Sequence, residues 1–284
     1  MKNLRIIGLL FGCLMLVATA TTAMADSFVL EGNYLRVGVS ESGGLIDDDF
    51  NAGIMFDPSG TKNFGIADYI TPGSPFEFYS IGINGEWDTT GYEYGNTFGV
   101  TTINTSSGTT FSANSTGAFG ALSITQNLWF DENSSVIHFL VTGTNTGEST
   151  LNNVVYARGL DPDQDYDPYG EYNTFNSIPA SNRVRAVGPY SNWFIDIEDQ
   201  SGGGVPTVDE EWDTDPYNLL VPHNDGDGDN TINMAWNAGD IEPGASVSAE
   251  FTYSVGVVPE PISLILFVSG GAIMAGRRYL KRRK

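Results

Sequence analysis

The amino-acid sequence predicts an all-β protein, a β-sandwich or jelly roll that lies between two targeting segments. Apolar and polar residues alternate with period two in several segments, and turn-forming Gly, Asn, Ser and Asp residues separate these segments. No amphipathic helix of four turns is found within 26–256. Many short strands joined by such turns are typical of sandwiches and jelly rolls. We expect 26–256 to form one acidic domain; two smaller sandwiches with a boundary in 196–215 are the alternative.

The strands can be placed by their alternation. In 122–130, 136–143 and 247–257, successive residues fall into two sets that would face opposite sides of a sheet. The segment 247–257 is the clearest, because Val247, Phe251 and Val255 share one face. Shorter candidate strands are Tyr34–Val39, Phe76–Ile83, Thr97–Asn104, Val154–Arg158 and Asn192–Ile197.

The charge of the body limits its function. Residues 26–256 carry five basic against 34 acidic residues, a formal charge of −29. This balance excludes a nucleic-acid partner, because phosphate binding needs clustered Lys and Arg. The hydrophobic fraction of 40% is still enough for a packed core, so disorder is not expected.

The N-terminus has the three parts of a secretory signal peptide at 1–25. Lys2 and Arg5 precede an apolar run over 6–17, and the small residues Ala23 and Ala25 mark cleavage before Asp26. A membrane anchor or a lipoprotein cut before Cys13 are the alternatives. Because Cys13 is the only cysteine, the exported domain is expected to have no disulfide.

The C-terminal segment 257–284 also has three parts. Pro259, Glu260 and Pro261 precede an apolar helix expected over 262–276, and a basic end over 277–284 begins with Arg277 and Arg278. This order resembles the PEP-CTERM sorting signal of bacterial exported proteins; a plain C-terminal anchor is the alternative. The resemblance implies transient anchoring in the membrane by this helix, processing by an exosortase-type transpeptidase, and association with exopolysaccharide in biofilms.

Two acidic runs in the body are candidate calcium loops. Alternating carboxylates can turn several oxygens toward one hard cation, and the Gly residues of the second run let the backbone bend. Arg158 could instead pair with the first run, and solvated turns are the other alternative. The predicted ligands are Asp161, Asp163, Asp165 and Asp167 in the first run, and Asp225, Asp227 and Asp229 in the second.

Aromatic residues in loop-like segments indicate glycan contact, with Trp193 and Trp212 as the candidates; packing against the core is the alternative. Sequence motifs of nucleophilic, metallopeptidase or phosphate-binding enzymes are absent. We therefore expect a non-enzymatic protein of the cell surface or biofilm matrix, exported to the cell envelope or extracellular matrix and stabilised by calcium. The alternative is a secreted carbohydrate-binding module or carbohydrate-active enzyme.

Overall fold

The computed structural model describes residues 27–49, 51–65, 67–91 and 93–259, and it confirms the all-β prediction. Within these residues there are 16 strands and one short helix, α1 (Tyr166–Tyr169). None of the helical structure in this part of the chain is long and apolar enough to cross a membrane. The predicted signal peptide 1–25 and the predicted tail helix 262–276 lie outside the described residues.

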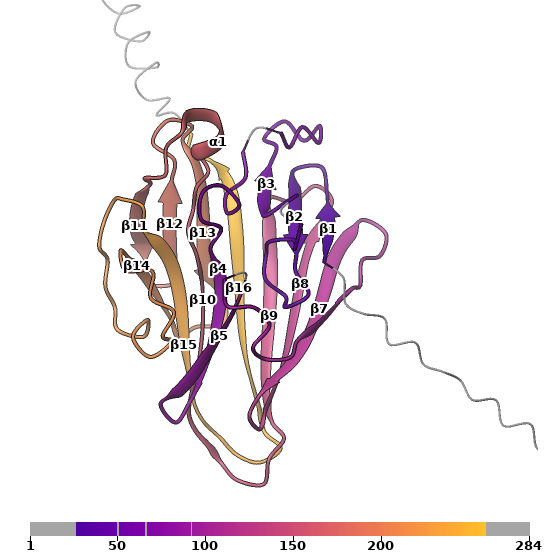
Figure 1. Ribbon diagram of the computed structural model, residues 1–284, viewed down its shortest axis with the longest axis vertical. Coiled ribbons are helices and arrows are strands. Elements are labelled where there is room, and N and C mark those ends of the chain that lie inside the picture. The colour runs from indigo at the N-terminus through magenta and orange to yellow at the C-terminus, as the bar shows by residue number, and fades with distance from the viewer. Residues whose placement is uncertain (1–26, 50, 66, 92, 260–284) are drawn as a thin grey trace, which may run out of the picture.

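Two large antiparallel sheets and one small sheet form the body (Figure 1). The eight-stranded sheet has the order β11-β12-β13-β16-β9-β8-β7-β6, the five-stranded sheet β14-β15-β10-β4-β5, and the small sheet β1-β2-β3. The eight-stranded sheet contains β6 (Thr101–Asn104), β7 (Thr110–Phe119), β8 (Leu122–Asp131), β9 (Val136–Asn145), β11 (Phe175–Ala180), β12 (Arg183–Val187), β13 (Trp193–Asp199) and β16 (Ser246–Val257). The other strands are β1 (Phe28–Glu31), β2 (Leu35–Val39), β3 (Ile54–Phe56), β4 (Glu77–Ile83), β5 (Glu86–Gly91), β10 (Leu151–Leu160), β14 (Gly204–Asp209) and β15 (Thr231–Ile241).

The two large sheets enclose the main core. In β8 every second residue is buried and the residues between are half-buried, so the predicted alternation is confirmed there. Across the sandwich, Trp236 of β15 lies over Phe251 of β16 with ring centroids 4.9 Å apart. Fully burying one large apolar side chain contributes about 1.5–3 kcal/mol, and rings of this size contribute most.

A second, smaller core lies on the far side of the five-stranded sheet, under the segment 210–230. Its buried members are Phe76, Phe78, Ala157, Leu219 and Ala235. The central strand β10 is therefore covered on both faces, which explains its continuous buried run from 154 to 160. The candidate domain boundary at 196–215 contains the end of β13 and all of β14, which belong to different sheets.

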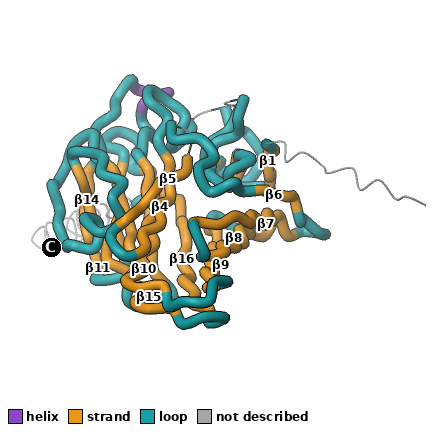
Figure 2. The backbone as a smooth tube through the Cα atoms, turned by 60° about the horizontal axis from the view of Figure 1, so that its bottom comes forward, coloured by secondary structure: helices purple, strands orange, loops and turns teal. Residues whose placement is uncertain are grey.

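The loops that carry the acidic runs meet beside α1. The first loop follows β10, and the second precedes β15; residues Thr174 and Gly228 join them through paired backbone hydrogen bonds of 2.9 and 3.0 Å. Figure 2 shows long loops gathered around α1 at the edge of the sheets. This arrangement brings two segments that are distant in the sequence to one surface.

Candidate functional site

Asp161 and Asp163 turn inward at the end of β10. The Asp161 amide donates to the Phe76 carbonyl at 3.0 Å, and the Asp163 amide donates to the Tyr69 carbonyl at 2.8 Å. These bonds hold the loop against the segment that precedes β4. Both aspartates are only 2% exposed, and each has a buried Oδ1 atom without a hydrogen-bond partner.

The third member of the cluster, Asp229, comes from the second acidic run. The carboxylate oxygens of Asp161, Asp163 and Asp229 lie within 4.8 Å of one another. The partner loop is fixed in place by Asp227, whose Oδ1 accepts the Asn176 amide at 2.9 Å. The structure thus joins part of each predicted calcium loop into one cluster.

The electrostatics of this cluster are unfavourable without a counter-ion. Burial, and then the charge of Asp229, raise the pKa of Asp161 to about 8. Burial, and then the charges of Asp161, Asp229 and Asp167, raise the pKa of Asp163 to about 9. Burial also raises the pKa of Asp229. Among the described residues, neither Lys nor Arg forms an ion pair with any of the three.

A metal ion would satisfy these groups. Three carboxylates supply the oxygen ligands that hard cations require, and backbone carbonyls or water can complete the shell. The fit rests on the unpartnered Oδ1 atoms of Asp161 and Asp163, since a buried acceptor without a donor costs free energy. Asp161, Asp163 and Asp229 could therefore hold a cation at this position.

The other predicted calcium ligands have different surroundings. Asp165 accepts the backbone amides of Tyr190 and Ser191 through Oδ2, at 2.7 and 3.1 Å, and so anchors the 188–192 turn. Asp167 is exposed on α1. Asp225 lies with Asp209 and His223 in a separate group.

The aromatic residues at this end of the molecule divide into half-buried and exposed rings. Trp193 packs edge-on against Phe56, and Trp212 packs on Phe76 while its Nε1 donates to the Asp229 carbonyl at 3.1 Å. Both predicted glycan residues are half-buried. Glycan contact through them stays a prediction.

Two exposed tyrosines beside the acidic loop form a further aromatic surface. Tyr169 is 56% and Tyr190 is 60% exposed, and their ring centroids are 5.4 Å apart at an interplanar angle of 37°. The Tyr190 amide is held by Asp165, so the pair is tied to the first acidic run. Sequence reasoning missed Tyr190; its place in the Gly188-Pro189-Tyr190 turn is the signal that could have found it.

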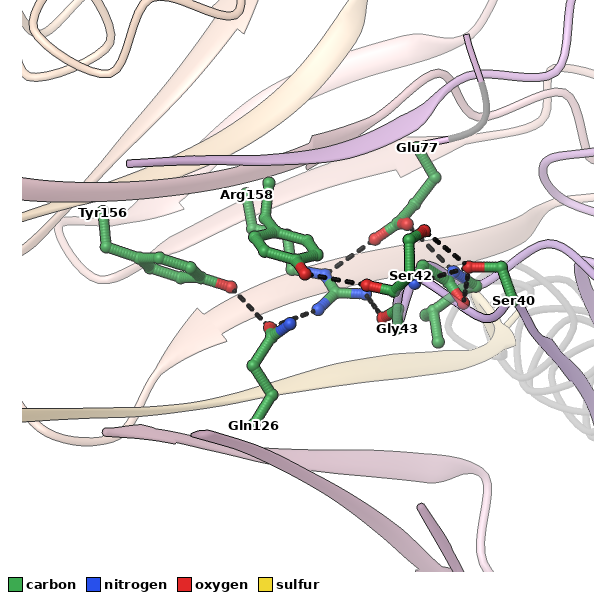
Figure 3. Close-up of polar contacts among 10 residues, drawn as sticks. Ser40, Ser42, Gly43, Glu77, Gln126, Tyr156 and Arg158 are labelled. Carbon is green, nitrogen blue, oxygen red and sulfur yellow. Dashed lines mark hydrogen bonds and ion pairs between the residues drawn. The ribbon is translucent and has the colours of Figure 1, made fainter. Parts of the chain in front are cut away.

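Arg158 is not a partner of the acidic loop, which corrects one of the sequence-based alternatives. It is fully buried between the large sheets, where its Nε donates to Glu77 Oε1 at 2.7 Å and its Nη1 donates to Gln126 Oε1 at 3.0 Å (Figure 3). The Tyr156 hydroxyl also donates to Gln126 Oε1, at 3.1 Å. Burial lowers the pKa of Arg158, but the Glu77 carboxylate together with Tyr156 and Tyr253 outweighs burial and raises the pKa above its ordinary value.

Comparisons with known proteins give fold likenesses alone. No family model and no curated protein matches the chain. A bacterial glucoamylase complexed with acarbose aligns with a TM-score of 0.56 and 12% identity, covering 83% of this chain and 33% of its own. A putative kojibiose phosphorylase from the human microbiome has a TM-score of 0.48 and 8% identity, covering 90% of this chain and 34% of its own. A putative aldose 1-epimerase from Escherichia coli has a TM-score of 0.43 and 12% identity, covering 82% and 99%.

Of these three, the glucoamylase likeness is high enough to show a shared fold, and the chain spans about a third of that enzyme. This finding contradicts the expectation of a non-enzymatic protein, because the arrangement of strands recurs within an enzyme chain. That expectation rested on missing linear motifs. Side chains from loops that are distant in the sequence come together in this fold, as those of Asp163 and Asp229 do, so missing linear motifs do not exclude an enzyme.

Proposed function

We propose that this protein is an exported carbohydrate-active β-sandwich protein that binds polysaccharide at the loop surface around α1. A calcium ion held by Asp161, Asp163 and Asp229 orders that surface. The glucoamylase-like fold supports the carbohydrate class. The observation that carries the proposal is the exposed pair of Tyr169 and Tyr190 beside the acidic loops.

The tyrosine pair has the chemistry of a sugar platform. An exposed aromatic ring offers a flat apolar face for the C–H face of a pyranose, and the nearby carboxylates accept hydrogen bonds from hydroxyl groups. Tyr169 ends α1 and Tyr190 lies in the turn that Asp165 anchors, so two independent segments present the rings.

Calcium has a structural part in this proposal. Asp161 and Asp163 belong to the loop that leads into α1, whereas Asp229 belongs to the loop that leads into β15. An ion shared by the three would neutralise their buried charge and hold the two loops together. Loss of the ion would then weaken sugar binding indirectly, through the position of α1 and Tyr169.

The two ends of the chain support the location. The signal peptide at 1–25 exports the body, and the PEP-CTERM-like segment at 257–284 directs it to an exosortase-type transpeptidase at the membrane. The acidic body then reaches the cell surface or the extracellular matrix. Exopolysaccharide is the carbohydrate that this route would present to it.

The test is binding of the purified protein to exopolysaccharide and to a panel of plain polysaccharides, with and without calcium. We expect Tyr169→Ala and Tyr190→Ala each to weaken binding about tenfold, which corresponds to about 1.4 kcal/mol. Trp87→Ala is the matched control: Trp87 is also an exposed aromatic residue, but the β4–β5 hairpin lies at the opposite end of the sandwich from α1 (Figure 1).

Two results would contradict the proposal: no binding to any polysaccharide, or equal binding by the tyrosine variants and the wild type. Release of reducing ends, measured in the same samples, distinguishes turnover from binding. If sugar is released, loss of release in Tyr169→Ala would place the reaction at this surface.

A further inference from the structure

Asp209, His223 and Asp225 form a second group of possible metal ligands, separate from the three-aspartate cluster. Asp209 ends β14, and the other two belong to the loop that covers the outer face of the five-stranded sheet. One ligand atom from each residue lies within 4.8 Å of the others. Backbone contacts hold the loop beside β14: the Asp225 amide donates to the Val208 carbonyl at 3.2 Å.

The hydrogen bonds of His223 determine which ring nitrogen carries the proton. Its Nδ1 lies 2.8 Å from the Val221 carbonyl, which can only accept, so Nδ1 is the donor. In the neutral ring, Nε2 then has a lone pair. That lone pair faces Asp209 Oδ2 at 3.3 Å, so two acceptors point at one another.

Asp209 is the buried carboxylate of this group. The residue is only 6% exposed, and its Oδ1 accepts the Glu211 amide at 2.7 Å. Among the described residues, its Oδ2 has one polar side-chain partner, His223 Nε2 at 3.3 Å, and that atom donates only when it carries a proton. A buried carboxylate oxygen in this state needs either a proton on His223 or a cation between the two groups.

Asp225 favours a cation over a proton. Its Oδ2 accepts the Glu210 amide at 3.1 Å, which directs a second carboxylate toward His223. A proton shared between His223 and Asp209 would not contact the Asp225 carboxylate. A metal ion at the same place would gain that carboxylate as a third ligand. One imidazole nitrogen with carboxylate oxygens suits Zn²⁺ and similar transition metals better than Ca²⁺. A backbone carbonyl on the other ring nitrogen is the usual support of a metal-binding histidine.

We propose that Asp209, His223 and Asp225 form a binding site for a divalent transition metal such as Zn²⁺. Three protein ligands leave a fourth position for water, and this position opens to solvent because Asp225 is exposed. The ion clamps the 210–230 segment to the end of β14. That segment supplies Leu219 and Trp212 to the smaller core on the outer face of the five-stranded sheet. The metal would therefore help to keep the segment packed on that face.

The test is a Co²⁺ titration of the untagged, metal-stripped full chain at pH 8, followed by the visible absorption of protein-bound Co²⁺. We expect one equivalent to bind, Zn²⁺ to displace it, and millimolar Ca²⁺ to leave it in place. His223→Gln and Asp209→Asn should each weaken Co²⁺ binding by at least about tenfold. His138→Gln is the control and should bind as the wild type does. His138 is the chain's other histidine and stacks on Trp129.

Three outcomes of the titration would overturn the proposal. They are the absence of a Co²⁺ band in the wild type, unchanged binding by His223→Gln, and displacement of Co²⁺ by millimolar Ca²⁺, which would place the ion among the three aspartates. The ¹⁵N shifts of His223 in the wild type give a readout that does not depend on variant folding. Nε2 protonated at pH 8, and unchanged by Zn²⁺, would mean a plain ion pair with Asp209.

Discussion

Two groups of buried charge lie close together along the chain and differ in how they are balanced. Arg158, inside β10, meets Glu77 of the neighbouring strand at 2.7 Å and shares its remaining donors with Gln126 and the Gly43 carbonyl. Asp161 follows β10 directly and meets two further aspartates instead. The charges of the first group cancel and its charged atoms are hydrogen-bonded by the protein, with Gln126 Nε2 left unpartnered, whereas the second group combines like charges with unpartnered carboxylate oxygens.

The difference indicates which buried charges serve the fold and which await a ligand. A buried ion pair is tolerated when its geometry is good and its other atoms are satisfied. The second carboxylate oxygen of Glu77 meets this condition, because it accepts the Leu45 amide at 2.9 Å. Asp161 and Asp163 do not meet it. An external cation could supply the partner that they lack.

The largest expected effect comes from breaking the balanced group. Glu77→Gln leaves the guanidinium of Arg158 charged and fully buried without a counter-charge, so unfolding free energy should fall by about 3–5 kcal/mol. Urea denaturation measures the loss. Calcium should not restore it, because the site of damage lies between the sheets.

Glu31→Gln is the control for this change. Glu31 lies 3.7 Å from the Lys62 ammonium, and both side chains are 42% exposed. Breaking such an exposed pair should change stability by about 0.5 kcal/mol or less. Equal small losses in both variants would contradict the contrast between paired core charges and surface charges.

The fold could be predicted from the sequence where one face of a strand is buried and the other is not. That is why β8 was found by alternation, since its burial follows period two. β7 was missed because its ten residues are mostly Ser, Thr, Ala, Gly and Asn, without an apolar period. β15 was missed for the opposite reason: its first six residues are all buried, so the pattern of alternation is lost.

The sequence indicates where the acidic loops are, but it does not indicate which of their aspartates come together in the fold. Spacing alone could not separate Asp163, which joins the three-aspartate cluster, from Asp165, whose Oδ2 caps the 188–192 turn while its Oδ1 is also buried without a partner. Nor could it show that Asp229 would meet Asp163 across the Thr174–Gly228 contact. The assignment depends on tertiary neighbours, which local residue patterns do not encode.

The second expected effect concerns the three-aspartate cluster, whose buried charge no protein group balances. Calcium at about ten times its Kd should stabilise the chelator-treated wild type by about 1.4 kcal/mol, a rise in Tm of about 3–6 °C for a domain of this size. Calorimetry in chelator and then in millimolar Ca²⁺ measures the change. No rise in Tm would remove calcium from the proposed function.

The calcium effect should depend on pH. With the pKa of Asp161 at about 8 and that of Asp163 at about 9, the metal-free folded state keeps protons that the unfolded chain, with aspartate near about 3.9, has released. Stability in chelator should therefore be highest near about pH 4 and fall as the pH rises toward 9, as far as these two groups are concerned. Calcium takes the place of those protons. The calcium-induced rise in Tm should thus be larger at pH 8.5 than at pH 6, and the reverse order would contradict the metal assignment.

The smallest expected effect has a sign opposite to that of Glu77→Gln. Asp163→Asn replaces a buried carboxyl that must take up a proton when the metal-free chain folds, and it nearly preserves the shape of the side chain, so it should stabilise the metal-free protein by about 1 kcal/mol at pH 8. The same variant should lose the calcium-induced rise in Tm. Asp227→Asn is its control, because the amide oxygen can still accept the Asn176 amide and calcium should still act. Destabilisation of the metal-free protein by Asp163→Asn would mean that this carboxylate already has a partner within the fold, and the two groups of buried charge would then be alike.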